Sequence, residues 1–106
     1  MTDRTKWSQS QPRCWMCGCW CWLETHEIAR GPARQAALSE PAAWVRVCGQ
    51  HHTEMGDLSI WPIARQLALK KRNDPDHYDR VAVNLLRGRQ AEAITESEVD
   101  DFARRM

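Results

Sequence analysis

A chain of 106 residues has room for one small domain, whose core usually needs support from a metal ion, disulfides or a partner. Charged residues make up 27% and hydrophobic residues 42% of it, as in globular proteins. A net charge of +1 excludes binding to polyanions through overall charge alone. No apolar run approaches the ~20 residues of a membrane span, and residues 1–12 lack a secretion signal, so we expect a cytoplasmic protein and no membrane partner.

The first half of the chain predicts a flexible arm, a cysteine-rich turn and two short strands. Residues 1–12 are polar and form the arm, and residues 14–22 form the turn, with Gly18 at its tightest point. Residues 20–28 alternate as a strand does, and residues 29–41 form a loop in which a helical turn is an alternative. A second strand is expected at residues 44–48, then a turn at Gly49 and a short helix at residues 50–55 that Gly56 ends.

The second half predicts three helices, at residues 63–72, 75–87 and 96–105. Pro62 and Pro75 stand at first helical turns, Gly88 stops the second helix, and Thr95 begins a capping box. The second helix is expected to bury Tyr78, Val81, Ala82, Leu85 and Leu86. We expect residues 13–57 to form the core and residues 58–106 to be a helical part of the same domain.

The cysteines indicate a metal site. Two residues separate Cys14 from Cys17, and two separate Cys48 from His51. Two such pairs supply a tetrahedral zinc site with three thiolates and one imidazole. An odd total of five cysteines argues against a closed disulfide set. Two alternatives remain on spacing alone. The predicted ligand set is Cys14, Cys17, Cys48 and His51. In the first alternative the cysteines bind no metal and are reduced, buried thiols. In the second, Cys19, Cys21 or His52 replaces one of the four ligands.

Thirty residues separate Cys17 from Cys48, more than the ~12 to 15 of a simple zinc finger. The most polar stretch of the chain, residues 24–31, lies inside this interval. It is followed by a hydrophobic strand that ends in Cys48 and then His51-His52.

This order of elements resembles the HNH endonucleases of the zinc-knuckle type, which are common in phages and bacteria. The matching positions are Cys14 and Cys17, then His26-Glu27-Ile28, then Cys48 to His52, and they cover residues 14–52. The resemblance implies a small α+β fold, in which a zinc-stapled ββα-metal hairpin, treble-clef-like, is followed by about three helices. It also implies a structural Zn²⁺ and a catalytic Mg²⁺ or other divalent ion.

Residue by residue, the resemblance assigns His52 and His26 as ligands of the catalytic ion. Glu27 stands at the position of the family's general-base histidine, and Ala43 stands near the position of its central asparagine. Sliding the match by one residue makes His26 the base and leaves Thr25 as a poor ligand. Arg30 and Arg34 follow in the loop and are expected to contact phosphates.

The predicted function is therefore hydrolysis of DNA phosphodiester bonds by a metal-dependent HNH-type endonuclease. The alternative is a non-catalytic zinc module of the same fold that binds DNA, or a protein partner through the C-terminal helices. We expect the helix at residues 63–72 to add phosphate contacts and four tryptophans to pack around the zinc. The residues are Arg65, Lys70, Lys71 and Arg72 for DNA, and Trp15, Trp20, Trp22 and Trp44 for the packing.

Overall fold

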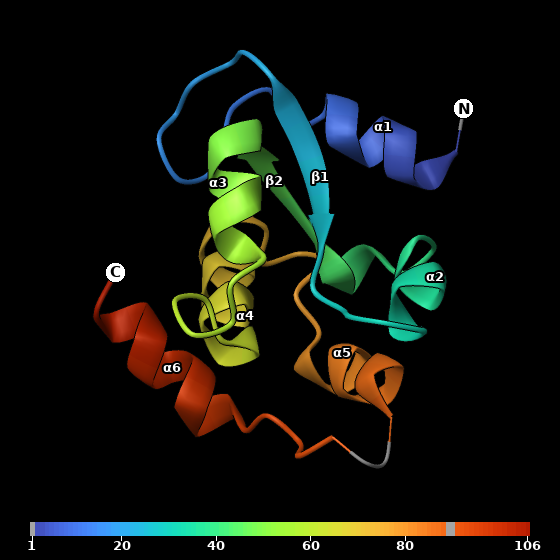
Figure 1. The fold of residues 1–106 in the computed structure, drawn as a ribbon, viewed down its shortest axis with the longest axis vertical. Coiled ribbons are helices and arrows are strands. Elements are labelled where there is room, and N and C mark those ends of the chain that lie inside the picture. The colour runs from blue at the N-terminus through green and yellow to red at the C-terminus, as the bar shows by residue number, and fades with distance from the viewer. Residues whose placement is uncertain (1, 89–90) are drawn as a thin grey trace.

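The computed structural model describes residues 2–88 and 91–106 (Figure 1). Within them, six α-helices and a short 3-10 helix surround a two-stranded sheet. None of these helices has the length and apolar composition needed to cross a membrane. In chain order the elements are α1 (Asp3–Gln9), β1 (Leu23–Glu27), α2 (Ala33–Ala37), η1 (Pro41–Ala43), β2 (Trp44–Cys48), α3 (Gly49–Met55), α4 (Ile63–Asn73), α5 (Arg80–Arg87) and α6 (Glu96–Arg104).

The sheet is an antiparallel pair, in which Leu23 lies opposite Cys48 and Glu27 lies opposite Trp44. The second strand has the predicted bounds, but the first begins at Leu23 rather than at residue 20. Trp22 adopts a left-handed backbone with φ of 58°, which interrupts the extended conformation just before the strand. Helix α3 follows β2 directly and contacts both strands, so the two strands and α3 pack as a ββα unit, with α2 and η1 in the connection between the strands (Figure 1).

The predicted flexible arm is instead helical in the part that the structure describes, which excludes Met1. The Thr2 hydroxyl caps helix α1 by accepting the Thr5 backbone N–H. Trp7 is buried and stacks edge-on against Trp15, with ring centroids 5.7 Å apart. A single large aromatic therefore anchors an otherwise polar segment, which has too few apolar residues to show a helical period.

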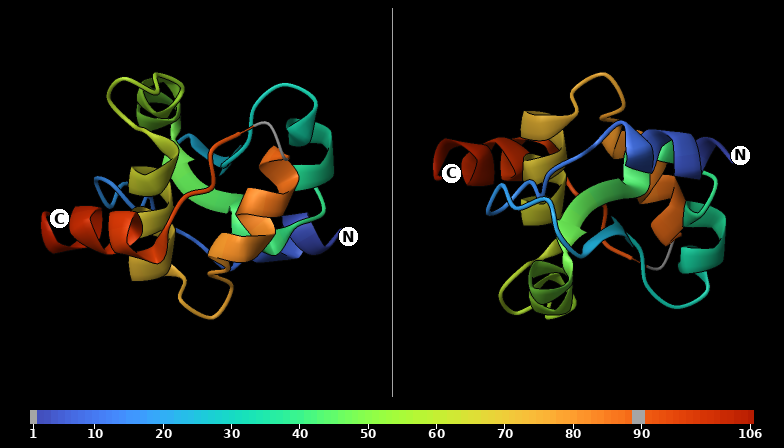
Figure 2. Two further views of the ribbon diagram at one scale, coloured as in Figure 1. Left: turned by 90° about the horizontal axis from the view of Figure 1, so that it is seen from below. Right: turned by 90° about the horizontal axis from the view of Figure 1, so that it is seen from above.

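The core lies between the sheet and helix α4, which has nearly its predicted bounds. Trp44, Val45 and Val47 of β2 are fully buried, and Leu67 and Ala68 of α4 are fully buried as well. Helix α6 packs across α4, as both views of Figure 2 show, with Val99 buried. The helical half thus completes one core with the ββα unit.

Helix α5 starts later than predicted, and its buried side differs. The Asp79 carboxylate caps it by accepting the Ala82 backbone N–H, so the helix begins at Arg80 and not at Pro75. Val83 is its buried residue, while Val81 and Leu85 are 55% and 76% exposed. Tyr78, Ala82 and Leu86 of the predicted stripe pack against the core, so the buried face is centred on Val83 and the prediction fails only at Val81 and Leu85.

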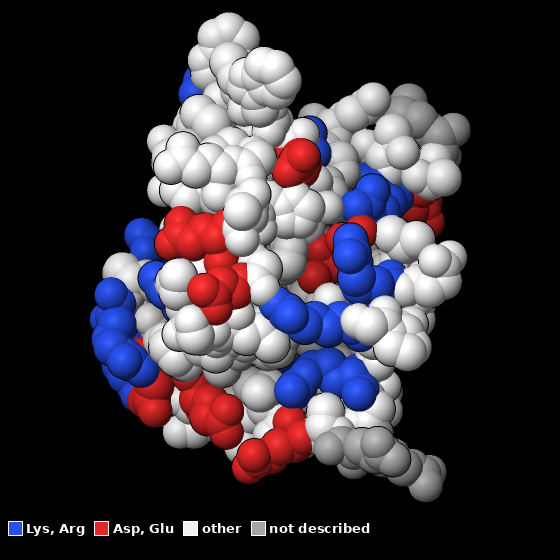
Figure 3. Space-filling view, in the orientation of Figure 1, with Lys and Arg blue, Asp and Glu red and all other residues white. Residues whose placement is uncertain are grey.

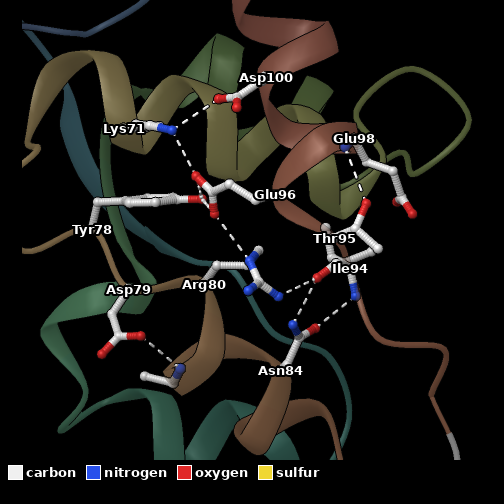
Figure 4. Close-up of polar contacts among 11 residues, drawn as sticks. Lys71, Tyr78, Asp79, Arg80, Asn84, Ile94, Thr95, Glu96, Glu98 and Asp100 are labelled. Carbon is white, nitrogen blue, oxygen red and sulfur yellow. Dashed lines mark hydrogen bonds and ion pairs between the residues drawn. The ribbon is translucent and has the colours of Figure 1, made fainter.

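Helix α6 begins with the predicted cap, because the Thr95 hydroxyl accepts the Glu98 backbone N–H (Figure 4). The next residue, Glu96, joins three elements in the same view. Its carboxylate accepts hydrogen bonds from Lys71 of α4, from the Tyr78 hydroxyl and from Arg80 of α5. One carboxylate therefore holds the helical half together.

Candidate functional site

The four predicted zinc ligands lie together where the knuckle meets the start of α3. Their ligand atoms all lie within 4.8 Å of one another. His51 Nδ1 is 3.2 Å from Cys48 Sγ and 3.7 Å from Cys14 Sγ, and the sulfurs of Cys17 and Cys48 are 4.0 Å apart. A tetrahedral zinc site requires ligand atoms about 3.5 to 3.8 Å apart. These residues are close enough to hold a metal ion such as zinc.

The electrostatics of the cluster fit a cation. Backbone hydrogen bonds lower the pKa of Cys14 against the effect of its burial, and the His51 backbone N–H lowers the pKa of Cys48. A backbone hydrogen bond from Cys19 lowers the pKa of Cys17, but neighbouring thiols and desolvation outweigh it and raise that pKa to about 12. Three thiols this close cannot all ionise without a positive charge between them, and a divalent metal supplies it.

The possible substitute ligands are not part of this group. Cys21 is exposed, and Cys19 Sγ lies 3.6 Å from the Cys21 carbonyl oxygen rather than joining the four ligands. Two of the four tryptophans expected around the zinc are also misplaced. Trp20 and Trp22 are 72% and 88% exposed, because the left-handed turn at Trp22 directs this segment away from the core.

Strand β1 places its side chains on two faces, because successive residues in a strand point in opposite directions. Glu24 and His26 point toward α3 and α4, where they contact His52 and Gln66. Thr25 and Glu27 point toward α1, where they contact Ser8 and Arg4. The candidate catalytic residues His26 and Glu27 are therefore on opposite faces of the strand.

His26 is oriented by a buried amide. Its Nε2 lies 2.7 Å from Gln66 Oε1, and Gln66 Nε2 donates to the Trp61 carbonyl oxygen at 2.8 Å. Because the amide nitrogen is used as a donor, Oε1 accepts a hydrogen from His26 Nε2, which leaves Nδ1 as the basic atom. Burial lowers the pKa of His26 from its ordinary value, so the ring is neutral near pH 7.

His52 is oriented in a similar way from the other side. Its Nδ1 lies 2.7 Å from Glu24 Oε2, so the carboxylate accepts from Nδ1 and leaves Nε2 free. The rings of His26 and His52 meet edge to face with their centroids 5.1 Å apart. Two imidazoles, each with one nitrogen restrained and one available, therefore lie side by side.

Both histidines line a cavity of about 340 Å³, to which we refer as the histidine cavity. The loop after β1 contributes Arg30 to its wall, and helix α2 contributes Arg34. Arg30 also donates to the Gly56 carbonyl oxygen at the end of α3, which fixes one side of the opening. The cavity thus combines a neutral base, a second imidazole and two cations.

Glu27 and Ala43, which the resemblance aligned with a histidine and an asparagine, have structural contacts instead. Glu27 is only 5% exposed, and its Oε1 accepts a hydrogen bond from Arg4 at 2.7 Å. Ala43 is fully buried, and its carbonyl oxygen accepts the Ile28 N–H. The Glu27 carboxylate is thereby committed to α1, and Ala43 has no polar side chain to offer a metal.

The basic residues expected to bind DNA on α4 have other contacts. Lys70 is fully buried, donates to Asp74 and to the Trp44 carbonyl oxygen, and cannot touch a surface ligand, so its assignment was wrong. Lys71 is shared between the carboxylates of Glu96 and Asp100. Lys70 follows Ile63 and Leu67 on the buried face of α4, and the interior salt bridge with Asp74 allows a charged group there.

Arg65 and Arg72 of the predicted DNA face remain at the surface. The Arg65 guanidinium lies 3.8 Å from the centre of the Trp61 ring, where it stacks as a cation on an aromatic face. Neither residue lines the histidine cavity.

Three contributors to the site were missed in the sequence: Gln66, Glu24 as the partner of His52, and Arg4. Only Gln66 carried a signal, because it is a polar residue beside Leu67 on the apolar side of a predicted helix. Comparisons with protein-family models, with curated proteins and with solved structures found no match to this chain. Its function must therefore be argued from the site.

Proposed function

We propose that this protein is a metal-dependent endonuclease of the HNH type, which hydrolyses phosphodiester bonds in DNA. The observation that carries the proposal is the pair His26 of β1 and His52 of α3, whose ring centroids lie 5.1 Å apart, together with the four-residue metal cluster at the start of α3. Arg30 and Arg34 beside the pair suit a phosphate.

His26 acts as the general base in this proposal. Its Nδ1 takes the proton from the attacking water, while Gln66 keeps the opposite nitrogen protonated. This corresponds to the match shifted by one residue, in which His26 rather than Glu27 activates water. Glu27 then has a structural role, because its carboxylate holds Arg4.

His52 would hold the divalent ion through Nε2, with Glu24 fixing the orientation of the ring. When bound, an ion such as Mg²⁺ supplies charge stabilisation to the phosphate and the leaving oxygen. Arg30 and Arg34 orient the phosphate against His26. A histidine next to the last zinc ligand thus couples the structural site to the catalytic one.

The test is cleavage of supercoiled plasmid by zinc-loaded protein with added Mg²⁺, Mn²⁺ or Ni²⁺. We expect nicking that requires the added ion and falls at least ~100-fold in His26→Ala, as removal of a general base does. His52→Ala should abolish cleavage while one zinc stays bound. A matched control is His77→Ala, since His77 lies after α4 and outside the histidine cavity. Cleavage that survives in zinc-loaded His26→Ala would reject the assigned chemistry.

A second function is favoured by the side chains at two family positions. With Glu27 paired to Arg4 and Ala43 lacking a polar group, the same fold can serve as a non-catalytic zinc module that binds DNA or a protein. Salt-sensitive DNA binding with intact plasmid in all three metals would decide for this module.

A further inference from the structure

Five arginines line three adjoining hollows on one side of the molecule. The histidine cavity is the middle hollow. A wider groove of about 600 Å³ lies between α1 and β1, and it shares Glu27, Arg34 and His52 with the cavity. A smaller hollow of about 200 Å³ shares Ala29 and Arg30 with the cavity on its other side. The arginines, called the arginine track below, are Arg4, Arg30, Arg34, Arg46 and Arg87.

The arginine track passes the open edge of the sheet. Thr25 of β1 lies opposite Arg46 of β2, so both side chains face α1. Arg4 of α1 reaches the same edge, where it donates to the Thr25 carbonyl oxygen at 3.0 Å. Figure 3 shows Lys and Arg side chains in a column from α1, past the end of β1, toward α5. Helix α1 therefore extends a basic surface that starts in the histidine cavity.

The positive charge of the track exceeds the negative charge beside it. Two carboxylates line the three hollows, Glu24 and Glu27, and Glu27 is buried against Arg4. In the part of the chain that the structure describes, Arg34 and Arg46 form no salt bridge. Burial and the nearby Arg4 charge lower the pKa of Arg46. Like charges held together without enough carboxylates favour an anionic ligand.

We propose that the arginine track binds the phosphate backbone of a DNA strand, which runs from the groove at α1 across the histidine pair to Arg87. This inference rests on the proposed function, which places the cut at the histidine pair. It assigns the path of the DNA to α1 and the sheet edge rather than to α4. Arg46 and Arg4 hold phosphates on one side of the cut, and Arg87 holds one on the other. The guanidinium groups contact phosphate oxygens and not base edges, so binding does not depend on sequence.

The dimensions of the protein set the length of the probe. Its longest extent is 36 Å, which spans about ten base pairs at ~3.4 Å each. A fluorescein-labelled duplex of 20 base pairs therefore covers the whole track. Anisotropy is measured with zinc-loaded full-length protein and no other divalent ion, so that binding is read without cleavage.

The variants are Arg34→Gln and Arg87→Gln, with Arg72→Gln and Arg104→Gln as controls on α4 and α6. The logarithm of DNA affinity falls linearly with the logarithm of salt concentration, and losing one phosphate contact reduces that slope by ~0.9. This corresponds to about an eightfold loss of affinity at 0.1 M salt. We expect that loss in both track variants and none in the controls. For Arg46→Gln, both DNA affinity and thermal unfolding are measured, because Arg46 also donates to the Gln11 carbonyl oxygen and its loss can affect stability.

Three outcomes overturn the track. They are no binding of the duplex by the unmodified protein, track variants that bind like it, and competition by polyglutamate equal to that by DNA at the same charge. The last outcome would indicate an acidic protein as the ligand. A protein that binds through the track but leaves plasmid intact supports the track and rejects the nuclease. A protein that cuts plasmid while track variants keep full affinity rejects the track alone.

Discussion

His26 Nε2 lies 2.7 Å from Gln66 Oε1, and Gln66 is 1% exposed. Rotating the Gln66 amide by 180° would break a hydrogen bond, because its nitrogen donates to the Trp61 carbonyl oxygen just before α4. An amide from one helix thus decides which nitrogen of a strand histidine carries the proton. Partners of this kind, which do not touch the substrate, commonly change activity 10–100-fold when removed.

We predict that Gln66→Leu lowers plasmid cleavage about 10–100-fold while zinc content and DNA affinity stay unchanged. The variant should also lose ~1–3 kcal/mol of stability, because the His26 N–H and the Trp61 carbonyl oxygen lose a buried partner. A nitrogen-15 NMR spectrum separates positioning from general damage, since the His26 tautomer should be mixed in the variant and a single Nε2–H form in the unmodified protein. Gln35→Leu, on the exposed face of α2, is the matched control. A single His26 tautomer in Gln66→Leu would contradict the positioning role.

The zinc cluster predicts that replacing a ligand cysteine and replacing a non-ligand cysteine affect zinc content and stability differently. Cys48→Ser should lose the metal and unfold, because zinc binding contributes on the order of 10 kcal/mol to the folding of small domains. Cys21→Ser should keep one zinc per chain and its melting temperature, because Cys21 is exposed and outside the ligand group. Zinc content by atomic emission and thermal unfolding check both. Equal zinc loss in the two variants would mean that Cys21 belongs to the ligand set.

Local spacing was enough to predict the metal cluster and most helices. Two-residue gaps bring Cys14 near Cys17 and Cys48 near His51, and the zinc then requires the two pairs to meet. The bounds of β2, and those of α4 and α6 to within one residue, followed from a short hydrophobic run, Pro62 and the Thr95 cap, which act within a few residues. Features of this kind need no knowledge of the tertiary structure.

Long-range contacts explain what the sequence did not predict. Lys70 looked solvated, but it is buried because Asp74 and the Trp44 carbonyl oxygen accept its protons. Arg4 looked like part of an arm, but Glu27 holds it 23 positions away along the chain. Asp74 lies four residues after Lys70, a spacing that places the two on one helix face. The Trp44 carbonyl oxygen and Glu27 lie on other elements, so helical periodicity carries no trace of those two contacts.

Comparing the buried Trp7 with the exposed Trp22 tests whether helix α1 is packed against the core. Trp7→Ala should destabilise the protein by about 3–5 kcal/mol, because it empties a site that packs on Trp44 and removes the hydrogen bond to Asp74. Trp22→Ala should change stability by less than about 0.5 kcal/mol, because that side chain is 88% exposed. Urea unfolding of the zinc-loaded variants measures both. If Trp7→Ala were as stable as Trp22→Ala, helix α1 would not be packed on the core, and the prediction of a flexible arm would stand.

Asp74 predicts how acid unfolds the protein. Burial alone would raise its pKa, but hydrogen bonds from Lys70, His77 and Trp7 outweigh burial and hold the pKa below 3.8. Since the folded pKa is depressed, the carboxylate stabilises the fold above pH ~4, and that contribution is lost as the pH falls through the folded value. Asp74→Asn should lose about 3 kcal/mol at pH 7, because it leaves the Lys70 charge buried without a partner.

Below pH ~4 the difference between the two proteins should shrink, because the unfolded chain of the unmodified protein then binds a proton at Asp74, the folded protein follows at lower pH, and the asparagine does not titrate. The measurement is the free energy of unfolding in urea from pH 2.5 to pH 7, with Asp76→Asn as the matched control on the exposed turn after α4. Parallel pH profiles for Asp74→Asn and the unmodified protein would show that the pair with Lys70 does not govern acid stability. Converging profiles would place the acid-sensitive bond at the junction of α4 with Trp7, where helix α1 is fastened to the core.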